Sequence, residues 1–499
     1  MRLGTGAGRG RRAALAGVLG AALTAGALTA GWGAVQAEAA PTPPPGHSSG
    51  KPGTKAAQPA QSPSHQAPPA AARPAVATKG PVLAPVVEGE DGLPTTAGLQ
   101  RELAPLLQDK ALGTLTFAVA DGATGKLLYG QGESTPATPA STTKLLTSLA
   151  ALSLIPAETR IATTVVAGAA PGEIVLVGGG DPTVTALPRD QVRIGGMPVD
   201  DDSAPASMAD LAKQTAAALK AAGTTSVKIS FDTSLYSGPI LHKENDSMNI
   251  AAVVPLMVDE GRINALSTDE APARVFDPAG QAADSFAAML GAQGITVQGK
   301  PKAGQAAAGA KQLGKVLSPT LPRLVERLLT TSDNTLAEAV ARQAALAAHQ
   351  PASFDGGVAA VTGALTKLGL PMAGVVLHDG SGLHTQNLIP PLVLAKVIGL
   401  ASAPEHPELR PVLTGMPIAG FTGTLVNRFG ATSGAQSAAG IVRAKTGSLS
   451  GINTLAGTVV DADGRVLVFA MMTKTTAAAD TARSAVDRIV AKIAACGCK

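Results

Sequence analysis

The stretch PASTTKLLTSLAALSL, residues 139–154, gives the most direct indication of the fold. Proline precedes a run of Ser and Thr, and the residues from Leu145 to Leu154 have helical character, so the stretch predicts a helix that begins near Ser141. Lys144 follows Ser141 by three residues, which places both side chains on one helix face. A serine here can simply cap the helix. It can also act as a nucleophile if a neighbouring amine removes its proton.

The i, i+3 spacing is weak evidence by itself, because residues 48–51 (SSGK) match it inside a low-complexity stretch. The residues before the helix predict a hairpin. Residues 115–120 alternate as a strand does, residues 121–125 (DGATG) form a turn, and residues 126–130 continue as the partner strand.

Two later stretches carry chemistry-bearing residues. SDN, residues 332–334, precedes a helical run over 335–348, and KTGS, residues 445–448, leads into predicted strands over 452–460 and 465–472. Ser332 or Asp333 could merely cap a helix, and Lys445 could be an ordinary edge-strand lysine. The order of the three stretches, Ser-x-x-Lys, then Ser-x-Asn, then Lys-Thr-Gly, is nevertheless the one found in penicillin-binding proteins and serine β-lactamases.

The resemblance can be narrowed by what lies between the motifs. Roughly 190 residues separate Ser141 from Ser332, which implies an inserted module over residues 161–315 that contains GGGDPT (178–183). With HDGSGL (378–383) and PIAGFTGTL (417–425), the chain resembles the D-alanyl-D-alanine carboxypeptidase/endopeptidase family, the low-molecular-mass class C penicillin-binding proteins. The resemblance covers about residues 99–490. One departure is HTQN (384–387), in which we expect His384 to lie in a surface loop.

The resemblance implies an α/β (α+β) fold, with a transpeptidase/β-lactamase-like domain in which helices flank an antiparallel sheet. This domain is expected over residues 95–160 and 316–499, with the large inserted module at 161–315 between the first and second motifs. The active cleft should form where the helix of Ser141, the helix start at Ser332 and the strand of Lys445 converge.

The resemblance also implies a role for each motif residue. Catalytic roles fall to Ser141 as nucleophile, Lys144 as its base and Ser332 as proton donor to the leaving amine. Substrate-binding roles fall to Asn334, Lys445, Thr446, Gly447 and Ser448, with backbone N–H groups of Ser141 and Ser448 binding the oxyanion. The expected substrates are peptidoglycan stem peptides ending in, or cross-linked by, D-Ala-D-Ala. β-Lactam antibiotics are the expected covalent inhibitors.

Two alternatives remain open. A class A β-lactamase would need a Glu-x-x-x-Asn loop, and none of the acidic residues between Asn334 and Lys445 has Asn four positions later. A non-catalytic cell-wall-binding or sensor module would be expected to have lost a catalytic group, whereas all three motifs are intact here. The residues do not decide between carboxypeptidase and endopeptidase preference.

The amino-acid composition limits the kinds of binding partner that we expect. Apolar residues make up 45% of the 499 residues, but only 8 Phe, 2 Tyr and 1 Trp are present, which disfavours a base-stacking nucleic-acid binder. The net charge is +4, and four arginines lie in the first twelve residues, so no basic surface is expected for nucleic acid. The seven His show no ligand spacing and no nucleotide loop is present, so we expect neither a metal nor another cofactor.

The N-terminal region predicts export. Residues 1–39 combine an arginine-rich start, an apolar run and small-x-small cleavage sites, as in a signal peptide, although an uncleaved membrane anchor is the alternative. Residues 40–94 are rich in Pro and Ala and predict a disordered linker. We therefore expect an extracellular, cell-wall-associated protein. Cys496 and Cys498 form either a disulfide at the C-terminal end or a pair of free thiols.

Overall fold

The two ends of the described chain build one antiparallel sheet. In the computed structural model, β1 (Thr114–Asp121) and β2 (Leu127–Gln131) form the predicted hairpin, and β1 pairs along its length with β13 (Val466–Lys474). β12 (Ile452–Val460) and β11 (Arg443–Leu449) complete the order β11-β12-β13-β1-β2. The strand of the Lys-Thr-Gly motif, β11, is therefore an edge strand of this sheet.

The structure describes residues 92–269 and 271–499, all within one compact unit. The predicted signal peptide at 1–39 and almost all of the predicted linker at 40–94 lie outside the described residues. Among the residues that are described, no helix has the length and apolar character needed to cross a membrane.

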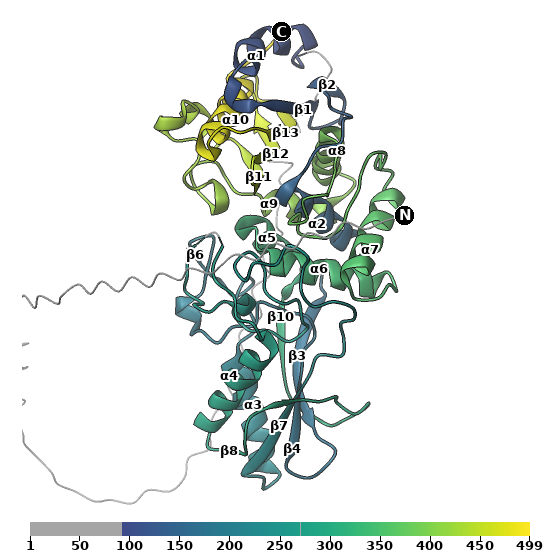
Figure 1. Ribbon diagram of the computed structural model, residues 1–499, viewed down its shortest axis with the longest axis vertical. Helices are drawn as coiled ribbons and strands as arrows, with labels where there is room; N and C mark the ends of the chain where they lie inside the picture. Colours follow the sequence, from purple (N-terminus) through teal and green to yellow (C-terminus); the bar gives the residue numbers. More distant parts are fainter. Residues whose placement is uncertain (1–91, 270) are drawn as a thin grey trace, which may run out of the picture. The chain divides into compact units, whose positions relative to one another are not determined.

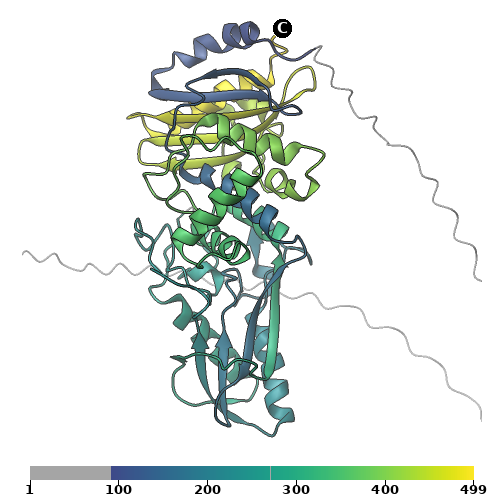
Figure 2. The same cartoon turned by 90° about the vertical axis from the view of Figure 1, so that its right-hand side faces the viewer.

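Both faces of the sheet are buried, because alternate residues face opposite helical layers. Phe117 packs in a core with residues of α1 (Thr96–Leu107) and α10 (Ala479–Ala494). Its neighbour Ala118 faces the other core, which includes residues of α8 (Pro391–Ser402). Figures 1 and 2 show α1 and α10 on one side of the sheet and α8 on the other. This arrangement of helices around an antiparallel sheet is the predicted one.

The second core also gathers the helices that carry two of the motifs. They are α2 (Thr143–Leu154), α5 (Leu321–Thr331), α6 (Asn334–Ala347), α7 (Phe354–Lys367) and the short α9 (Pro411–Thr414). Helix α2 is buried along nearly its whole length, because α5, α6, α7 and α8 all contact it.

The segment between the first two motifs builds a second sheet with its own core. The strand order is β10-β3-β4-β7-β8, with β9 also pairing β7, and two helices pack against it. The elements are β3 (Arg160–Ala167), β4 (Glu173–Val177), α3 (Met208–Ala221), β7 (Ser226–Asp232), α4 (Pro278–Ala292), β8 (Thr296–Val297), β9 (Lys302–Ala303) and β10 (Gln312–Thr320), with a separate small hairpin of β5 (Arg193–Ile194) and β6 (Met197–Pro198). Since β3 and β10 are neighbours, the segment leaves and re-enters the catalytic half at one place.

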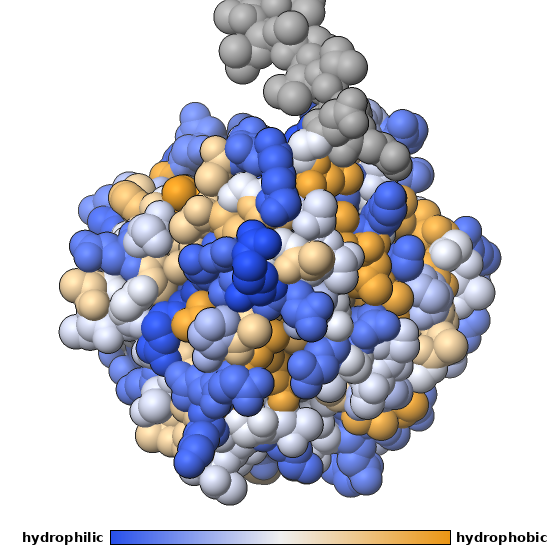
Figure 3. Space-filling model, turned by 90° about the horizontal axis from the view of Figure 1, so that it is seen from above, coloured by the Kyte–Doolittle hydropathy of each residue, from blue (hydrophilic) through white to orange (hydrophobic). Residues whose placement is uncertain are grey.

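The C-terminal end closes against the start of the described chain. The backbone N–H of Thr95 donates to the carbonyl of Cys498 over 2.9 Å. Cys496 and Cys498 are bonded to each other and are buried beside α1 and α10. The face shown in Figure 3 carries hydrophilic side chains over much of its area, with smaller apolar areas between them.

Candidate active site

The backbone around Ser141 is held in an unusual conformation. Ala140, a non-glycine residue, has φ +48°, and residues 140–142 form one 3-10 turn before α2. The hydroxyls of Thr142 and Thr143 donate back to the carbonyls of Pro139 (2.7 Å) and Ala140 (2.9 Å). A positive φ in a residue other than glycine costs roughly 1–3 kcal/mol and persists only when the surroundings fix it. These bonds supply that constraint and leave Ser141 partly exposed at the head of the helix.

Lys144 is fully buried directly behind Ser141. Its Nζ lies 2.9 Å from Ser141 Oγ, 2.6 Å from Asn334 Oδ1 and 2.7 Å from the carbonyl oxygen of Ser381. Burial lowers the pKa of Lys144 from its ordinary value to about 8, although three nearby carboxylates (Asp379, Asp333 and Glu338) act in the opposite direction. An amine with this pKa is neutral often enough near neutral pH to accept a proton.

Ser332 and Lys445 form a second hydroxyl–amine pair on the other side of the site. Ser332 has φ +59° at the C-terminal end of α5, while Asp333 caps α6 by accepting the N–H of Leu336 over 3.0 Å. This conformation turns the hydroxyl of Ser332 toward β11, where Lys445 Nζ donates to it over 2.7 Å. The same Nζ also donates to the carbonyl of Thr446.

Asn334 has its orientation fixed by a backbone group of the inserted segment. Its Nδ2 donates to the carbonyl of Asn249 over 3.0 Å, which leaves Oδ1 to accept from Lys144. The sequence contains the pattern Ser-x-Asn at residues 247–249 as well, but no role was predicted for it. In the structure, Asn249 of this pattern supplies the carbonyl that accepts the hydrogen bond from Asn334.

Strand β11 passes against the turn of Ser141, and only glycine fits at position 447. A Cβ there would lie 2.8 Å from the carbonyl oxygen of Pro139 and 3.0 Å from the backbone N of Ser141, and closer still to Thr454 Oγ1. Ser448, the next residue along β11, lines the same cavity as Ser141. The side chain of Ser448 is held by Arg483 Nη2 at 3.1 Å.

A cavity of about 260 Å³ opens onto these groups. Six of the eight residues predicted from the sequence line it, namely Ser141, Ser332, Asn334, Thr446, Gly447 and Ser448. The other two, Lys144 and Lys445, are fully buried behind it and hydrogen-bond its serines. Three segments that are far apart in the sequence thus converge on one cavity.

A buried network that was not predicted supports Lys144 from behind. Glu338 accepts the N–H groups of Gly380 (3.0 Å) and Ser381 (2.8 Å), so the carbonyl of Ser381 points at Lys144. Burial is the largest cause that raises the pKa of Glu338, and the nearby carboxylate of Asp379 raises it further. The only sequence signal for Glu338 is that it lies in the helical run predicted over residues 335–348.

Asp379 fixes the same loop. It pairs with His242 of the inserted segment over 2.9 Å and accepts the N–H of Gly382 and the amide of Asn387. Burial alone would raise the pKa of Asp379, but the hydrogen bonds, above all the one with His242, hold it below its ordinary value.

Among the described residues, one group of side chains has atoms close enough together to hold a metal ion. It consists of His242, Glu338 and Asp379, whose candidate ligand atoms lie within 4.8 Å of one another. His242 Nε2 is bonded to Asp379, its Nδ1 accepts the N–H of Glu244, and Glu338 Oε1 accepts two backbone N–H groups. These bonds suit a structural network, and the expected absence of a metal stays a prediction.

The expectation for His384 is wrong. It is only 6% exposed, and its ring stacks on His378 with centroids 4.4 Å apart. Its backbone N–H donates to Asp379 over 2.7 Å, which draws the residue inward. Burial lowers the pKa of the His384 imidazole.

Comparison with known proteins adds to this geometry. Residues 99–273 and 265–493 match the family described as "D-Ala-D-Ala carboxypeptidase 3 (S13) family". Carboxypeptidase DacB of Mycolicibacterium smegmatis is 37% identical over 431 residues, covering 85% of this chain and 90% of that protein. Carboxypeptidase Rv3627c of Mycobacterium tuberculosis is 36% identical over 421 residues, covering 81% of this chain and 85% of that protein.

A solved structure shares the fold. Penicillin binding protein 4 of Haemophilus influenzae superposes with a TM-score of 0.60 at 21% sequence identity, over 78% of this chain and 97% of that one. The predicted fold class, helices around an antiparallel sheet in a transpeptidase-like domain, is therefore confirmed. The exact boundaries of the predicted domains stay a prediction.

Proposed function

Since the chain belongs to the D-Ala-D-Ala carboxypeptidase 3 (S13) family, and is a serine-type carboxypeptidase of the low-molecular-mass penicillin-binding class, we propose that it acts on peptidoglycan stem peptides through an ester on Ser141. The observation that carries this proposal is the contact between Ser141 Oγ and the buried amine of Lys144, at 2.9 Å. The reaction is hydrolysis of the bond between two D-alanines, at a chain end or in a cross-link.

Acylation begins with proton transfer. Neutral Lys144 takes the proton of Ser141, and the alkoxide attacks the carbonyl carbon of the scissile bond. Asn334 and the carbonyl of Ser381 hold the amine at the distance that this transfer needs. Because both acceptors face the amine, they also stabilise the ammonium that forms.

The oxyanion is stabilised by two backbone N–H groups, those of Ser141 and Ser448. The glycine at position 447 permits β11 to approach the turn of Ser141 closely enough for both to face one oxygen. Losing one such donor costs about 3 kcal/mol of transition-state stabilisation.

The leaving amine receives its proton from Ser332, and the ammonium of Lys144 gives the proton that it took from Ser141 to the Ser332 oxygen. Lys445 donates to the hydroxyl of Ser332, so the hydroxyl proton is free to point into the cavity toward the amine. Lys445 and Thr446 supply positive potential and a hydroxyl for the terminal carboxylate of the substrate. Water then hydrolyses the ester and returns a proton to Ser141.

A β-lactam follows the first half of this sequence. Attack by Ser141 opens the lactam ring, and the amine that leaves the carbonyl remains tethered to the acyl group. It therefore stays in the site and hinders the entry of water. On this basis we propose that β-lactams are covalent inhibitors. We also propose that the protein is exported to the cell wall, with its N-terminal segment either cleaved or kept as a membrane anchor.

The test is release of D-alanine from a stem pentapeptide ending in D-Ala-D-Ala. Ser141→Ala should abolish release and labelling by fluorescent penicillin. Ser153→Ala, at an exposed serine on the same helix, is the matched control and should keep both. Release of D-alanine by the Ser141→Ala variant at the wild-type rate would overturn the mechanism.

A further inference from the structure

Arg483 places a positive charge directly behind one wall of the active-site cavity. It lies in α10, and its Nη2 donates to the side-chain oxygen of Ser448 over 3.1 Å. Ser448 lines the active-site cavity, whereas Arg483 is not among the described residues that line it. The reaction derived above uses the backbone N–H of Ser448, and it gives no role to the hydroxyl of Ser448 or to Arg483.

The pleat of β11 places the hydroxyls of Thr446 and Ser448 on one face of the strand. Side chains two residues apart in a strand share a face, and Ala444, two residues before Thr446, packs in the core that contains residues of α10. Lys445 projects from the opposite face, where its Nζ donates to Ser332. The charges of Lys445 and Arg483 therefore approach the cavity from different sides of β11.

Of these two hydroxyls, the one of Ser448 has its proton available for a ligand. Thr446 donates its proton to Thr424 Oγ1 over 2.8 Å. Ser448 Oγ instead accepts from Arg483, and a serine hydroxyl carries one proton and two lone pairs, so its own proton can point elsewhere. A charged donor on the hydroxyl oxygen also polarises the O–H bond, which makes the hydroxyl a stronger donor to an anion.

The charge of Arg483 is balanced only by a carboxylate in solvent. Its Nη1 lies 3.3 Å from Asp480 Oδ1, and the side chain of Asp480 is 95% exposed. An ion pair with such an exposed partner contributes little, because water screens it. Arg428 differs, since it pairs with Asp487, whose side chain is buried. The guanidinium of Arg483 therefore keeps most of its attraction for an anion at Ser448.

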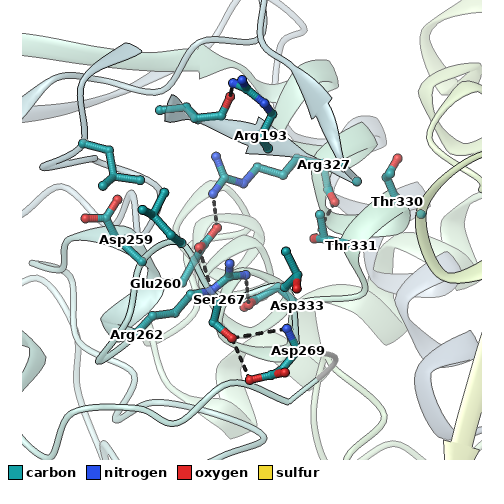
Figure 4. A pocket seen from close by; sticks show the side chains of 18 of the residues that line it. Arg193, Asp259, Glu260, Arg262, Ser267, Asp269, Arg327, Thr330, Thr331 and Asp333 are labelled. Atoms are coloured by element: carbon teal, nitrogen blue, oxygen red, sulfur yellow. Dashed lines mark hydrogen bonds and ion pairs between the residues drawn. The ribbon is translucent and has the colours of Figure 1, made fainter. Parts of the chain in front are cut away.

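The larger neighbouring cavity, of about 610 Å³, does not supply such a charge. It shares Thr331 with the active-site cavity, and its wall holds three arginines and four carboxylates. Figure 4 shows Arg327 paired with Glu260, and Arg262 beside both Glu260 and Asp333. Since these arginines are already matched by carboxylates, the cavity offers no net positive charge to the end of a substrate.

We propose that Arg483 is a positioning residue that directs the hydroxyl of Ser448 toward the α-carboxylate of the residue that leaves. This inference rests on the proposed function. The two oxygens of that carboxylate can accept from Ser448 and from Thr446, once the hydroxyl of Thr446 rotates away from Thr424. Because the carboxylate is present in the substrate and in the transition state alike, the contact should lower KM and leave kcat nearly unchanged.

The experiment measures KM and kcat for two stem pentapeptides, one with a free C-terminal carboxylate and one with a C-terminal amide. Arg483→Gln should raise KM for the acid by about tenfold with kcat within about twofold, and should leave kcat/KM for the amide unchanged. Arg483→Lys keeps the positive charge and should recover part of the loss. The matched control is Arg488→Gln, which removes an arginine of similar exposure from α10, paired with Asp109, and should change neither constant.

Ser448→Ala tests whether Arg483 acts through this hydroxyl. The substitution removes the hydroxyl but keeps the backbone N–H that binds the oxyanion. It should raise KM for the acid by a similar factor, and adding Arg483→Gln should change KM little further, because both substitutions remove the same contact.

The outcomes distinguish the two proposals. A fall in kcat with unchanged KM, equal losses on the acid and the amide, or additive effects of the two substitutions would overturn the role of Arg483. If every form of the enzyme hydrolyses the amide too slowly to measure, the change in KM for the acid decides alone. A wild-type enzyme that hydrolyses neither peptide would instead overturn the proposed function.

Discussion

At the scale of the residue, the charge state of Lys144 controls acylation. Burial lowers its pKa to about 8, and only the neutral amine can take the proton of Ser141. Below pH 8 the neutral fraction falls as pH falls, so the acylation rate should drop by about tenfold per pH unit and level off above pH 8. The measurement is the rate of acylation by a chromogenic β-lactam between pH 5 and pH 10.

Lys144→Arg is the matched control for this profile. A guanidinium keeps a positive charge in the site but is never neutral in proteins, so acylation should fall by at least about 10²-fold at every pH. A flat wild-type profile across pH 8, or an arginine variant that acylates normally, would contradict the assignment of Lys144 as the base.

The sequence could predict the residues whose positions relative to one another are set by local helix geometry or by the order of the motifs. Helical spacing predicted that Ser141 and Lys144 share a face, and the structure places their reactive atoms in contact. The carbonyl of Asn249 and the imidazole of His242 could not be predicted, because both reach the site only through tertiary packing of the inserted segment. His384 was misplaced for the same reason, since a single hydrogen bond to buried Asp379 draws it inward.

At the scale of the element, the approach of β11 to the turn before α2 builds the oxyanion site. Gly447→Ala would place a methyl group 2.8 Å from the carbonyl of Pro139 and 3.0 Å from the N of Ser141, which forces the strand and the turn apart. The expected result is a loss of about 10²–10³-fold in kcat, because one oxyanion donor moves out of reach. Steady-state release of D-alanine measures it.

Gly291→Ala is the control for this substitution. Gly291 lies in α4, and a Cβ there meets nothing within 4 Å. Alanine is the better helix former, so the variant should be slightly more stable, by up to about 1 kcal/mol, with unchanged kcat. A Gly447→Ala variant that keeps full activity would show that β11 does not supply an oxyanion donor.

The start of α6 depends on one buried carboxylate. Asp333 caps the helix and pairs with Arg274, which is itself 5% exposed. Asp333→Ala removes the cap, at about 1 kcal/mol, and leaves a buried arginine without its partner, at about 3–5 kcal/mol. Urea unfolding should therefore show a loss of several kcal/mol. Asp277→Ala removes the exposed cap of α4, which pairs with no arginine among the described residues, and should cost only about 1 kcal/mol.

Acid should remove the same stabilisation. Burial alone would raise the pKa of Asp333, but Arg274 and then Arg262 hold it well below its ordinary value. The stabilisation is therefore fully present above about pH 4 and is lost as pH falls toward the folded-state pKa. The free energies of unfolding of wild type and Asp333→Ala should therefore differ less at pH 3 than at pH 7. A constant difference between them would contradict the ion pair.

Elements were predicted well where periodicity is strong and less well where a side chain competes with the backbone. β12 was predicted at residues 452–460 and is found there, because alternation and the following turn fix it. The sequence left open whether Ser332 or Asp333 caps α6. The structure assigns the cap to Asp333, whose carboxylate accepts the N–H of Leu336, and this frees Ser332 to turn toward Lys445.

At the scale of the whole molecule, the inserted segment has its own core and contacts the catalytic half through polar pairs and a small apolar cluster. The polar contacts include Asn249 with Asn334, His242 with Asp379, and Arg274 with Asp333. Motif spacing predicted that a segment is inserted, but it could not predict that the segment orients the amide of a motif residue. We infer that the segment acts on catalysis chiefly by setting the orientation of Asn334.

Replacement of residues 161–319 by a short Gly/Ser linker tests this inference. Arg160 pairs with Thr320, so the two ends are already neighbours and the linker adds no strain. We expect cooperative unfolding to persist, since the two cores of the catalytic half draw few residues from the segment. Penicillin acylation should fall by about 10²-fold, because Asn334 loses the carbonyl that orients it. In the full chain Asn334→Ala should cost about the same, and combining it with the deletion should add little, because on this inference the deletion lowers acylation through Asn334. Additive losses would show that the segment acts on catalysis by another route.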